Sequence, residues 1–437
     1  MSESSNRRDF LKTTAAATAV AASSASLYAA GGGDTVRVGL IGCGGRGRGA
    51  VKDILNAEDK INGANPKVEI VAVADVFKNK AEDAAKAFAN EKSKDYGKFH
   101  KQIKISPDTT FSGLDAYQKL LAADVNLVIL ATPPGFRPTH LEAAVRAGKN
   151  IFCEKPVCVD ATGARKCYGL VEESKKKNIA IVAGTQRRHQ KGYIESIKKI
   201  RDGAIGEVRS ARCSWNGQGI WFHDRAANAS DVEYQLNNWY HFLWVCGDHI
   251  VEQHVHNLDV INWVMGGPPV KAVGMGGRAT RKPGDPNVVG NIWDHFAVEY
   301  TYPNGVQMAS YCRHIPGKED VSETVVGAKG TFTTQGGGYK INGQPCGDDD
   351  ISAYVQEHID LLNSIRAGRP LNELKNVIDS TFTAILGRNA SYACNELKWD
   401  AALASGEDTM PKDLTLSTKL DVSRAPVPGS WKLPPRA

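Results

Sequence analysis

Apolar residues gather in short runs between residues 35 and 185, and polar or amphipathic stretches separate these runs. The runs occupy 36–41, 68–74, 125–131, 150–153 and 179–183. Short runs without alternation are typical of strands buried on both faces of a parallel sheet. The segments 49–56, 78–90, 114–121, 140–148 and 161–177 predict helices between the strands. This alternation predicts an α/β fold, a doubly wound parallel sheet that ends with the strand at 179–183.

The pattern changes after residue 185. Segments 207–215, 269–276, 295–302 and 306–314 are rich in β-formers and partly alternating, and Pro303-Asn304-Gly305 predicts a hairpin between the last two. Segment 327–334 predicts a further strand or two. Helices are expected at 192–201, 252–265, 355–366 and 376–395. We therefore predict a second, α+β domain with a largely antiparallel sheet over residues 186–405, followed by a proline-rich tail, 406–437.

A glycine pattern follows the first strand directly. Gly42, Gly44 and Gly47 form G-x-G-x-x-G at the start of the first expected helix. Such glycines allow the tight turn, the approach of a pyrophosphate and close packing of helix on strand. The free N–H groups and positive end of the helix favour phosphate binding. Because a strand, a helix and a second strand surround it, the pattern predicts a dinucleotide-binding Rossmann domain over residues 34–185.

The second strand ends in Asp75. A carboxylate at this place accepts hydrogen bonds from the adenosine ribose hydroxyls and repels a 2′-phosphate. The sequence therefore predicts NAD as the cofactor in preference to NADP.

Two later strands also end in polar or rigid residues. Thr132-Pro133-Pro134 follows the strand at 125–131, and Glu154-Lys155-Pro156 follows Asn150–Cys153. The carboxyl ends of parallel strands form the ligand edge of a doubly wound sheet. We expect the cofactor to contact this edge through Gly42, Gly44, Gly45, Arg46, Gly47, Asp75, Thr132, Pro133, Pro134, Glu154 and Lys155.

The N-terminal region has the features of an export signal. Arg7-Arg8 lies within the sequence Asn6-Arg-Arg-Asp-Phe-Leu-Lys12, and an alanine-rich run occupies 13–30. This combination predicts a twin-arginine signal peptide over residues 1–33 and a periplasmic or cell-envelope location in a bacterium. The run is too weakly apolar for a stable membrane span. The twin-arginine route carries folded proteins, which suits a protein that binds a nucleotide before export.

Composition and charge narrow the function classes. The net charge of +6 is modest for 437 residues, and the lysines and arginines are spread along the chain, which argues against nucleic acid as a partner. The nine cysteines include no C-x-x-C pair. We expect Cys43, Cys153, Cys213 and Cys312 to be buried thiols rather than members of a disulfide framework.

These motifs resemble the Gfo/Idh/MocA family of oxidoreductases, the glucose–fructose oxidoreductase and inositol dehydrogenase type. The resemblance rests on GLIGCGGRG, on ATPP (131–134), on EKP (154–156) and on the run EQHVHNLD (252–259) that leads to Trp263. It implies NAD(P)-dependent chemistry on a ring hydroxyl of a sugar or cyclitol. It also implies that Lys155 contacts substrate and nicotinamide, faced by an acid and a histidine four residues apart, here Glu252 and His256. The acid of the family is usually aspartate, so Glu252 departs from that pattern.

The residue types fit this chemistry. Removing a hydroxyl proton during hydride transfer requires a base, and neutral His256 is the natural candidate. Glu252, one helical turn earlier, is expected to orient the ring, and Lys155 to hold the reacting oxygen. Arg187 and His254, with His256, are candidate substrate-binding residues. Arg188 and His189, next to Arg187, are candidates for the cleft or for a solvated turn.

Histidines and acids crowd into residues 223–256. If one helix carried His249, Glu252 and His256 on one face, they could bind a divalent metal. The alternative, which we favour, is a polar sugar pocket without metal, in which imidazoles and carboxylates hold hydroxyls and a tryptophan stacks on the ring; the candidates are Trp215, Trp221, Trp239 and Trp244.

Three functions remain open at this point. The first is an exported NAD-dependent dehydrogenase acting on a secondary ring hydroxyl of a sugar, glycoside or cyclitol. The second is a glycoside-cleaving hydrolase or lyase that oxidises its substrate, breaks the activated bond and re-reduces the product with tightly bound NAD. The third is a non-catalytic binding protein, against which Lys155, Glu252 and His256 together argue. An exposed face of the second sheet favours a homo-oligomer.

Overall fold

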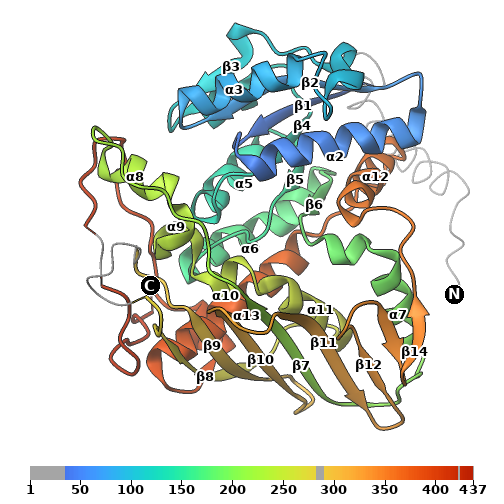
Figure 1. Ribbon diagram of the computed structural model, residues 1–437, viewed down its shortest axis with the longest axis vertical. Coiled ribbons are helices and arrows are strands. Elements are labelled where there is room, and N and C mark those ends of the chain that lie inside the picture. The colour runs from blue at the N-terminus through green and yellow to red at the C-terminus, as the bar shows by residue number, and fades with distance from the viewer. Residues whose placement is uncertain (1–34, 282–289, 422–423, 437) are drawn as a thin grey trace, which may run out of the picture.

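The computed structural model describes residues 35–281, 290–421 and 424–436, so the predicted signal peptide lies outside the described residues. The chain forms two sheets, one above the other in Figure 1. No helix within the described ranges is long and apolar enough to cross a membrane.

The upper sheet is parallel, as predicted, with the strand order β3-β2-β1-β4-β5-β6. The order reverses between β1 and β4, and ligands of such sheets bind outside the carboxyl ends of the strands at this point. The short strand β3 was not predicted, because its three residues carry no apolar run. The strands are Val36–Ile41 (β1), Val68–Asp75 (β2), Thr110–Ser112 (β3), Leu127–Leu130 (β4), Asn150–Cys153 (β5) and Ile181–Ala183 (β6).

Helices cover both faces of this sheet, since apolar side chains point to either side of each buried strand. On one face lie α2 (Gly45–Asn62) and α3 (Lys78–Ala89). On the other lie α4 (Ala116–Ala122), α5 (Arg137–Arg146) and α6 (Ala161–Lys176). Helix α12 (Ala353–Arg366) belongs to the predicted second domain by sequence, yet it packs beside α2 and contributes Leu361 and Leu362 to the same core.

The lower sheet has nine strands in the order β14-β13-β12-β11-β7-β10-β9-β8-β15. Only β7 and β10 pair in parallel among these strands, so the prediction of a largely antiparallel sheet is confirmed. Asn304-Gly305 turns β9 into β10, as predicted. The strands are Val208–Gly217 (β7), Lys271–Gly277 (β8), His295–Thr301 (β9), Gln307–His314 (β10), Asp320–Gly327 (β11), Thr331–Thr333 (β12), Tyr339–Ile341 (β13), Gln344–Gly347 (β14) and Leu397–Lys398 (β15).

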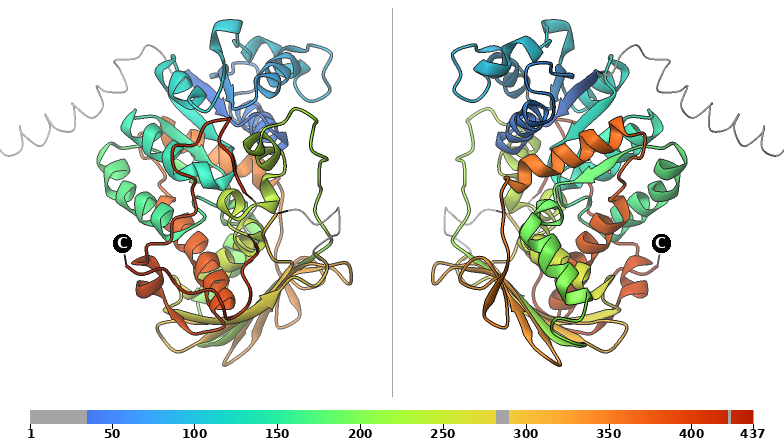
Figure 2. Two further views of the ribbon diagram at one scale, coloured as in Figure 1. Left: turned by 90° about the vertical axis from the view of Figure 1, so that its left-hand side faces the viewer. Right: turned by 90° about the vertical axis from the view of Figure 1, so that its right-hand side faces the viewer.

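Helices cover only the inner face of the lower sheet. They are α7 (Lys191–Arg201), α11 (Val255–Met265) and α13 (Leu374–Ala393). No helix of the described residues covers the outer face, which forms the lower boundary of the molecule in Figure 2. Val273, Met275 and Tyr311 are exposed there, Met275 to 69%. The apolar outer face is therefore open in the single chain.

The expected helix 252–265 is two helices. The first, α10 (His249–Glu252), ends before Gln253, and α11 starts at Val255. His254 lies between them, and its ring nitrogen Nε2 hydrogen-bonds the hydroxyl of Ser310 on β10 at 2.8 Å. Docking this ring on the sheet accompanies the break, which the apolar periodicity of the segment does not reveal. The predicted helix is confirmed from Val255 to Met265, but Glu252 belongs to the separate helix α10.

The cysteines behave as small apolar residues. All nine are free, and eight are buried, among them Cys43, Cys153, Cys213 and Cys312 as predicted. Burial raises the pKa of Cys153 to about 12, which keeps the thiol protonated and unreactive.

Candidate active site

The glycine loop joins β1 to α2 and has the shape of a phosphate cradle. Gly42 has φ +100°, and a Cβ there would lie 2.6 Å from the backbone of Ala131 and Thr132. A Cβ on Gly47 would overlap the carbonyl oxygen of Gly42. At Gly44 and Gly45, by contrast, a Cβ would meet no described atom within 4 Å. The loop is therefore packed tightly on its inner side and open on the side where a pyrophosphate would approach the N-terminus of α2.

Asp75 stands beside this loop at the end of β2. Its carboxylate accepts hydrogen bonds from the backbone N–H of Cys43 at 2.8 Å and of Phe77 at 2.9 Å. These bonds fix the carboxylate at the loop, where the ribose of a bound dinucleotide lies in such folds. The residues present thus fit NAD.

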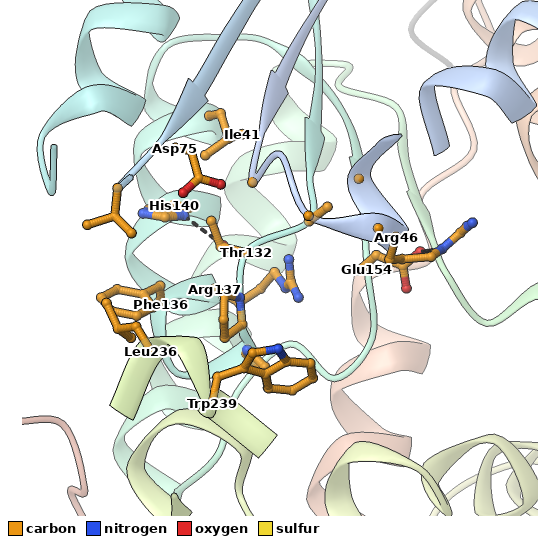
Figure 3. Close-up of a pocket in the computed structure, with 18 of the residues that line it drawn as sticks. Ile41, Arg46, Asp75, Thr132, Phe136, Arg137, His140, Glu154, Leu236 and Trp239 are labelled. Carbon is orange, nitrogen blue, oxygen red and sulfur yellow. Dashed lines mark hydrogen bonds and ion pairs between the residues drawn. The ribbon is translucent and has the colours of Figure 1, made fainter. Parts of the chain in front are cut away.

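A cavity of about 570 Å³ extends from this loop. Figure 3 shows Asp75 and Ile41 on one side of it and Trp239 on the other. The lining brings together every residue that the sequence predicts for cofactor contact, together with the predicted catalytic residues. These are Gly42, Gly44, Gly45, Arg46, Gly47, Asp75, Thr132, Pro133, Pro134, Glu154, Lys155, Glu252 and His256.

Lys155 and Glu252 form an ion pair in the cavity. Nζ of Lys155 donates to Oε1 of Glu252 at 2.9 Å and to its backbone carbonyl oxygen at 2.6 Å. Each side chain is only 10% exposed. Burial raises the pKa of Glu252, although the neighbouring Lys155 opposes the shift. Glu252 Oε2 is buried without a hydrogen-bond partner among the described residues.

His256 lines the cavity from α11, in the turn after the helix break. Burial, and after it the positive charges of Lys155 and Arg187, lower the pKa of His256 well below 6.5, so the imidazole is neutral at pH 7. Its ring stacks on Trp215 of β7, with centroids 5.9 Å apart. Nδ1 is buried and unpartnered in the described chain. The predicted support of this ring by Glu252 is not observed, because Glu252 bonds to Lys155 instead.

Two predicted substrate-binding residues lie outside the cavity lining. His254 is fully buried against the lower sheet, on Ser310 and Cys213. Arg187 forms an ion pair with Glu323 of β11, whose side chain is fully buried. Because His254 faces the sheet and Arg187 is held by its carboxylate partner, the prediction of direct substrate contact is not supported for either.

Arg187, Arg188 and His189 belong to η4 (Gln186–His189) and connect three elements. Arg188 forms a two-pronged ion pair with Asp259 of α11 at 2.9 to 3.0 Å. His189 contacts Asp360 of α12 through Nδ1 at 2.7 Å. Neither Arg188 nor His189 lines the cavity, and their side chains are only 12% and 4% exposed. The triplet joins elements of the two halves of the chain through largely buried ion pairs.

Arg46 lines the cavity, and several neighbouring side chains bind its guanidinium group. It forms ion pairs with Glu154, with Asp53 at 3.0 Å and with Glu357 at 3.2 Å. Its guanidinium lies 4.8 Å from the ring centroid of Tyr354. Tyr354 and Glu357 come from α12, more than 300 residues along the chain, so the glycine motif alone gives no signal for them.

Other cavity residues also escaped prediction. His140 of α5 hydrogen-bonds Thr132 Oγ1 through Nδ1 at 3.1 Å, and burial lowers its pKa to about 3. Phe77 and Lys80 follow β2 on the same side. A histidine, a phenylalanine and a lysine at these positions look like ordinary helix residues in the sequence, and only the fold places them at the ligand edge.

Two of the four candidate tryptophans line the cavity, and the other two do not. Trp221 and Trp239 line the cavity, with ring centroids 6.1 Å apart, and Gln253 lies on the same lining. Trp215 supports His256 from outside the lining. Trp244 packs in a separate apolar cluster, and its Nε1 donates to Gln235 at 2.7 Å.

The structure does not support a metal site on a shared helix face. His249 is on α10, and its ring packs against His314 at 4.3 Å and Phe296 at 5.3 Å. Within the residues that the structure describes, no group of three or more histidines, cysteines and acids is arranged to hold a metal ion.

Comparisons with known proteins agree with this geometry. Residues 36–182 match the model "Oxidoreductase family, NAD-binding Rossmann fold", and residues 194–333 match "GFO/IDH/MocA C-terminal domain". Residues 4–24 match a twin-arginine translocation signal sequence.

The individual relatives have low sequence identity to this chain. The chain is 29% identical to an inositol 2-dehydrogenase of Rhizobium meliloti over 236 residues, which are 54% of this chain and 57% of that one. It is 27% identical to a glycosyl hydrolase family 109 protein of Streptomyces coelicolor over 209 residues, 47% of this chain and 38% of that one. The chain thus matches about half the length, or less, of these curated relatives.

A solved structure shows the same fold over most of the chain. The aldose-aldose oxidoreductase of Caulobacter crescentus, complexed with glycerol, superposes with a TM-score of 0.63 at 18% identity, covering 83% of this chain and 99% of that one. With both family models matched along the two sheets, the chain belongs to the Gfo/Idh/MocA oxidoreductase family, with an NAD-binding Rossmann domain and a twin-arginine signal sequence.

Proposed function

We propose that this protein is an NAD(H)-dependent oxidoreductase acting on a secondary ring hydroxyl of a sugar, glycoside or cyclitol. The observation that carries the proposal is the meeting of Lys155, Glu252 and His256 in the cavity that also contains the glycine loop and Asp75. The match to an inositol 2-dehydrogenase supports the substrate class.

Lys155 is the residue that holds the reacting oxygen. Two of its donors bond to Glu252, which fixes the ammonium group and leaves a third N–H for substrate. A fixed positive charge stabilises the negative charge that develops on the oxygen as its proton leaves. Bound NAD⁺ supplies the acceptor for the hydride of the carbinol carbon.

His256 is the base that takes the hydroxyl proton. It is neutral at pH 7, since burial and nearby cations lower its pKa, and it faces the same cavity as Lys155. Trp215 restricts the ring by stacking on it. In the reverse direction the protonated imidazole returns the proton to the alkoxide oxygen.

Trp221 and Trp239 give the cavity an aromatic wall suited to a sugar or cyclitol ring. Sugars present C–H groups on one face of the ring and hydroxyls around its rim, so an aromatic side chain packs on the face while polar groups bind the rim. Gln253, which also lines the cavity, is available to the hydroxyls.

The glycoside-cleaving alternative keeps one specific support. A glycosyl hydrolase family 109 protein of Streptomyces coelicolor is among the relatives. In that case a transient ketone acidifies the neighbouring C–H bond, Glu252 or His256 removes the proton, and the leaving group departs. The ketone is then reduced again, so no net NADH accumulates.

The signal sequence and the open face of the lower sheet extend the proposal to the location and the oligomeric state of the protein. We infer export through the twin-arginine route to the periplasm or cell envelope. We also infer a homo-oligomer in which a second copy covers Val273, Met275 and Tyr311 on the outer face of the lower sheet. Light scattering at several protein concentrations tests this, and a monomer at every concentration contradicts it.

Mixing the purified protein with sugars, cyclitols and aryl glycosides decides between the two reactions. The dehydrogenase predicts growth of the reduced-nicotinamide absorbance band in proportion to added NAD, without aryl release. Glycoside cleavage predicts aryl release over many turnovers without net reduction. Loss of either signal in Lys155→Ala assigns it to this site.

A further inference from the structure

Trp221 is the most exposed tryptophan of the chain, and it is also one of the residues that line the cavity. All eight tryptophans of the sequence lie within the described residues, and only Trp221 is exposed, to 41%. Tryptophan is on average highly buried, because its large apolar ring is unfavourable in water. Since the Trp221 ring both lines the cavity and faces solvent, it lies where the cavity opens to solvent.

Trp221 is the middle one of three rings that lead from the cavity to the surface. Trp239 lines the cavity and is only partly exposed, and its ring centroid lies 6.1 Å from that of Trp221. On the solvent side, the exposed ring of His223 lies 5.1 Å from Trp221, with 34° between the ring planes. His223 is outside the cavity lining. We call Trp239, Trp221 and His223 the aromatic row.

The segment around Trp221 has no regular secondary structure, yet hydrogen bonds fix its backbone. Asn238, which is fully buried, accepts from the N–H of His223 and donates to the carbonyl oxygen of the same residue, both at 2.9 Å. Nε2 of His241 bonds to the carbonyl oxygen of Trp221 at 2.7 Å. Phe222 packs in an apolar cluster that is separate from the cores of the two sheets. The exposed Trp221 ring is therefore held in place before any ligand arrives, which lowers the entropic cost of binding to it.

The inner end of the aromatic row is close to the predicted catalytic residues. Trp239 lies on the opposite side of the cavity from Asp75, the residue expected to bind the adenosine ribose (Figure 3). The next residue, Tyr240, lies close enough to Glu252 that this carboxylate, after burial, raises the pKa of the Tyr240 hydroxyl. A ring that packs on Trp239 is thus near Glu252 and away from the adenosine end of the cavity.

We propose that the substrate carries a second ring beside the ring that reacts, and that Trp221 binds this second ring. The inference rests on the proposed function, because it takes the reacting ring to lie at Lys155 and His256. The reacting ring packs on the inner end of the row, at Trp239, and the ring joined to it by the glycosidic bond reaches Trp221 at the opening. The substrate class is therefore a glycoside with a ring as its aglycone, either a second sugar or an aromatic group.

Stacking on Trp221 suits both kinds of second ring. A sugar presents the C–H groups of one ring face to the indole, and an aromatic group stacks its own face on it. Either contact removes exposed indole surface from water, which favours binding. The ring nitrogens of His223, at the outer end of the row, offer polar contacts to the hydroxyls of a second sugar. A free monosaccharide or cyclitol that occupies only the reacting position leaves the Trp221 ring in water.

Binding to the NADH-loaded protein tests this subsite without turnover, because the reduced nucleotide cannot accept a hydride. Methyl and phenyl glycosides of glucose and galactose, in both anomers, are titrated by calorimetry, and the members of each pair differ only in the second ring. Maltose, cellobiose, lactose and melibiose present the same two sugars with a sugar as the second ring. Trp221→Ala removes the indole, and Trp221→Phe keeps a smaller ring. Asn228→Ala changes an exposed residue of the same segment and serves as the matched control.

We expect at least one phenyl glycoside or disaccharide to bind the wild type about tenfold tighter than the methyl glycoside of the same sugar and anomer, the upper range for one aromatic contact. This ratio should fall below about threefold in Trp221→Ala, stay above about threefold in Trp221→Phe and equal the wild-type value in Asn228→Ala. A preference for the disaccharide identifies the second ring as a sugar, and a preference for the phenyl glycoside identifies it as an aromatic group.

Two results would overturn the proposal. One is the absence of any preference in the wild type, or a preference that Trp221→Ala retains in full. The other is a loss of NADH affinity in Trp221→Ala as large as the loss for the preferred glycoside, which would assign the ring to the nucleotide.

The same glycosides, mixed with NAD⁺-loaded protein, separate the subsite from the proposed function. A preference that depends on Trp221, without reduction of NAD⁺ by any of the glycosides, supports the subsite and counts against the proposed function. Reduction of NAD⁺ with no preference for a second ring supports the proposed function and counts against the subsite.

Discussion

Lys155 and Glu252 lie 97 residues apart in the sequence and meet in the cavity, where the Lys155 ammonium group bonds to both the carboxylate and the backbone carbonyl of Glu252. One residue follows a strand of the upper sheet, and the other ends a short helix of the second half of the chain. The pair therefore closes the gap between the two halves at the point where substrate and nicotinamide must meet.

Removing the charge of Glu252 should impair the reaction but not nucleotide binding. In Glu252→Gln the amide keeps the size of the side chain and can accept a hydrogen bond, but the charge attraction to the Lys155 ammonium group is lost, so the bond to the backbone carbonyl of residue 252 is the stronger one left to hold it. We expect kcat to fall about 10²-fold, as is typical when a preorganised polar group is disturbed. Titration with NADH should give the wild-type affinity. A variant with unchanged kcat would show that the pair is only structural.

Because the loop is open at Gly44, a substitution there should weaken nucleotide binding without destabilising the fold. A Cβ at this position meets no described atom, so Gly44→Ala should fold normally, while its methyl group occupies the approach path of the pyrophosphate. We expect NADH affinity to drop at least tenfold with little change in Tm.

Gly169→Ala is the matched control for this substitution. Gly169 lies exposed within α6, and a Cβ there also meets no described atom. Since alanine favours the helix, Tm should stay the same or rise slightly, and nucleotide affinity should be unchanged. If both variants bound NADH equally well, the loop would not be the phosphate site.

Asp75 should determine the choice between NAD and NADP. Asp75→Ser removes the charge that repels a 2′-phosphate and shortens the side chain that accepts the ribose hydroxyls. We expect the ratio of the Kd values for NADP and NAD to fall at least tenfold, measured by titration of each nucleotide. An unchanged ratio would place the ribose elsewhere. The hydrogen bonds from Cys43 and Phe77 to Asp75 predict some loss of stability as well.

Buried histidines should make the fold sensitive to mild acid. His358 of α12 is fully buried against Phe152, and neither ring nitrogen has a partner in the described chain. Burial, with the charges of Arg46 and His189, lowers its pKa well below 6.5. The unfolded chain then binds a proton below about pH 6.5 that the folded chain does not, so stability falls as the pH falls through this range.

Each such histidine costs about 1.4 kcal/mol of unfolding free energy per pH unit in that window. The variant His358→Leu should therefore lose less stability than the wild type between pH 7.5 and 5.5, by roughly 1.4 kcal/mol. Urea unfolding at the two pH values measures the difference. Parallel losses in both proteins would mean that His358 takes up its proton in the folded state.

The features that the sequence predicts well are those with a local signal. The run Val36–Ile41, the glycines after it and Asp75 at the next strand end all lie within 40 residues, and the structure places them as expected. The EKP and ATPP segments follow their strands for the same reason. Parallel strands end at a common edge of the sheet, so the residues that follow each strand are predicted to line the cavity.

The features that the sequence predicts poorly depend on contacts between distant segments. The ring of His254 bonds to Ser310, 56 residues away, and lies at the break between α10 and α11. Arg187 looks like a cleft residue until the fold presents Glu323 to it. Residues 218–248, which supply α8 (Asp231–Asn237) and its cavity residues, have no clear periodicity, because their apolar side chains face the tail and the Rossmann edge rather than one sheet.

The most direct test of the central claim is a single turnover at Lys155. Wild-type protein loaded with NAD⁺ is mixed rapidly with the best cyclitol or sugar of the panel, and the reduced-nicotinamide absorbance is followed in the first turnover. The proposed mechanism predicts a burst of up to one equivalent per site, at least 10³-fold slower in Lys155→Met, with NADH affinity unchanged. A burst of the same rate in Lys155→Met would contradict the mechanism.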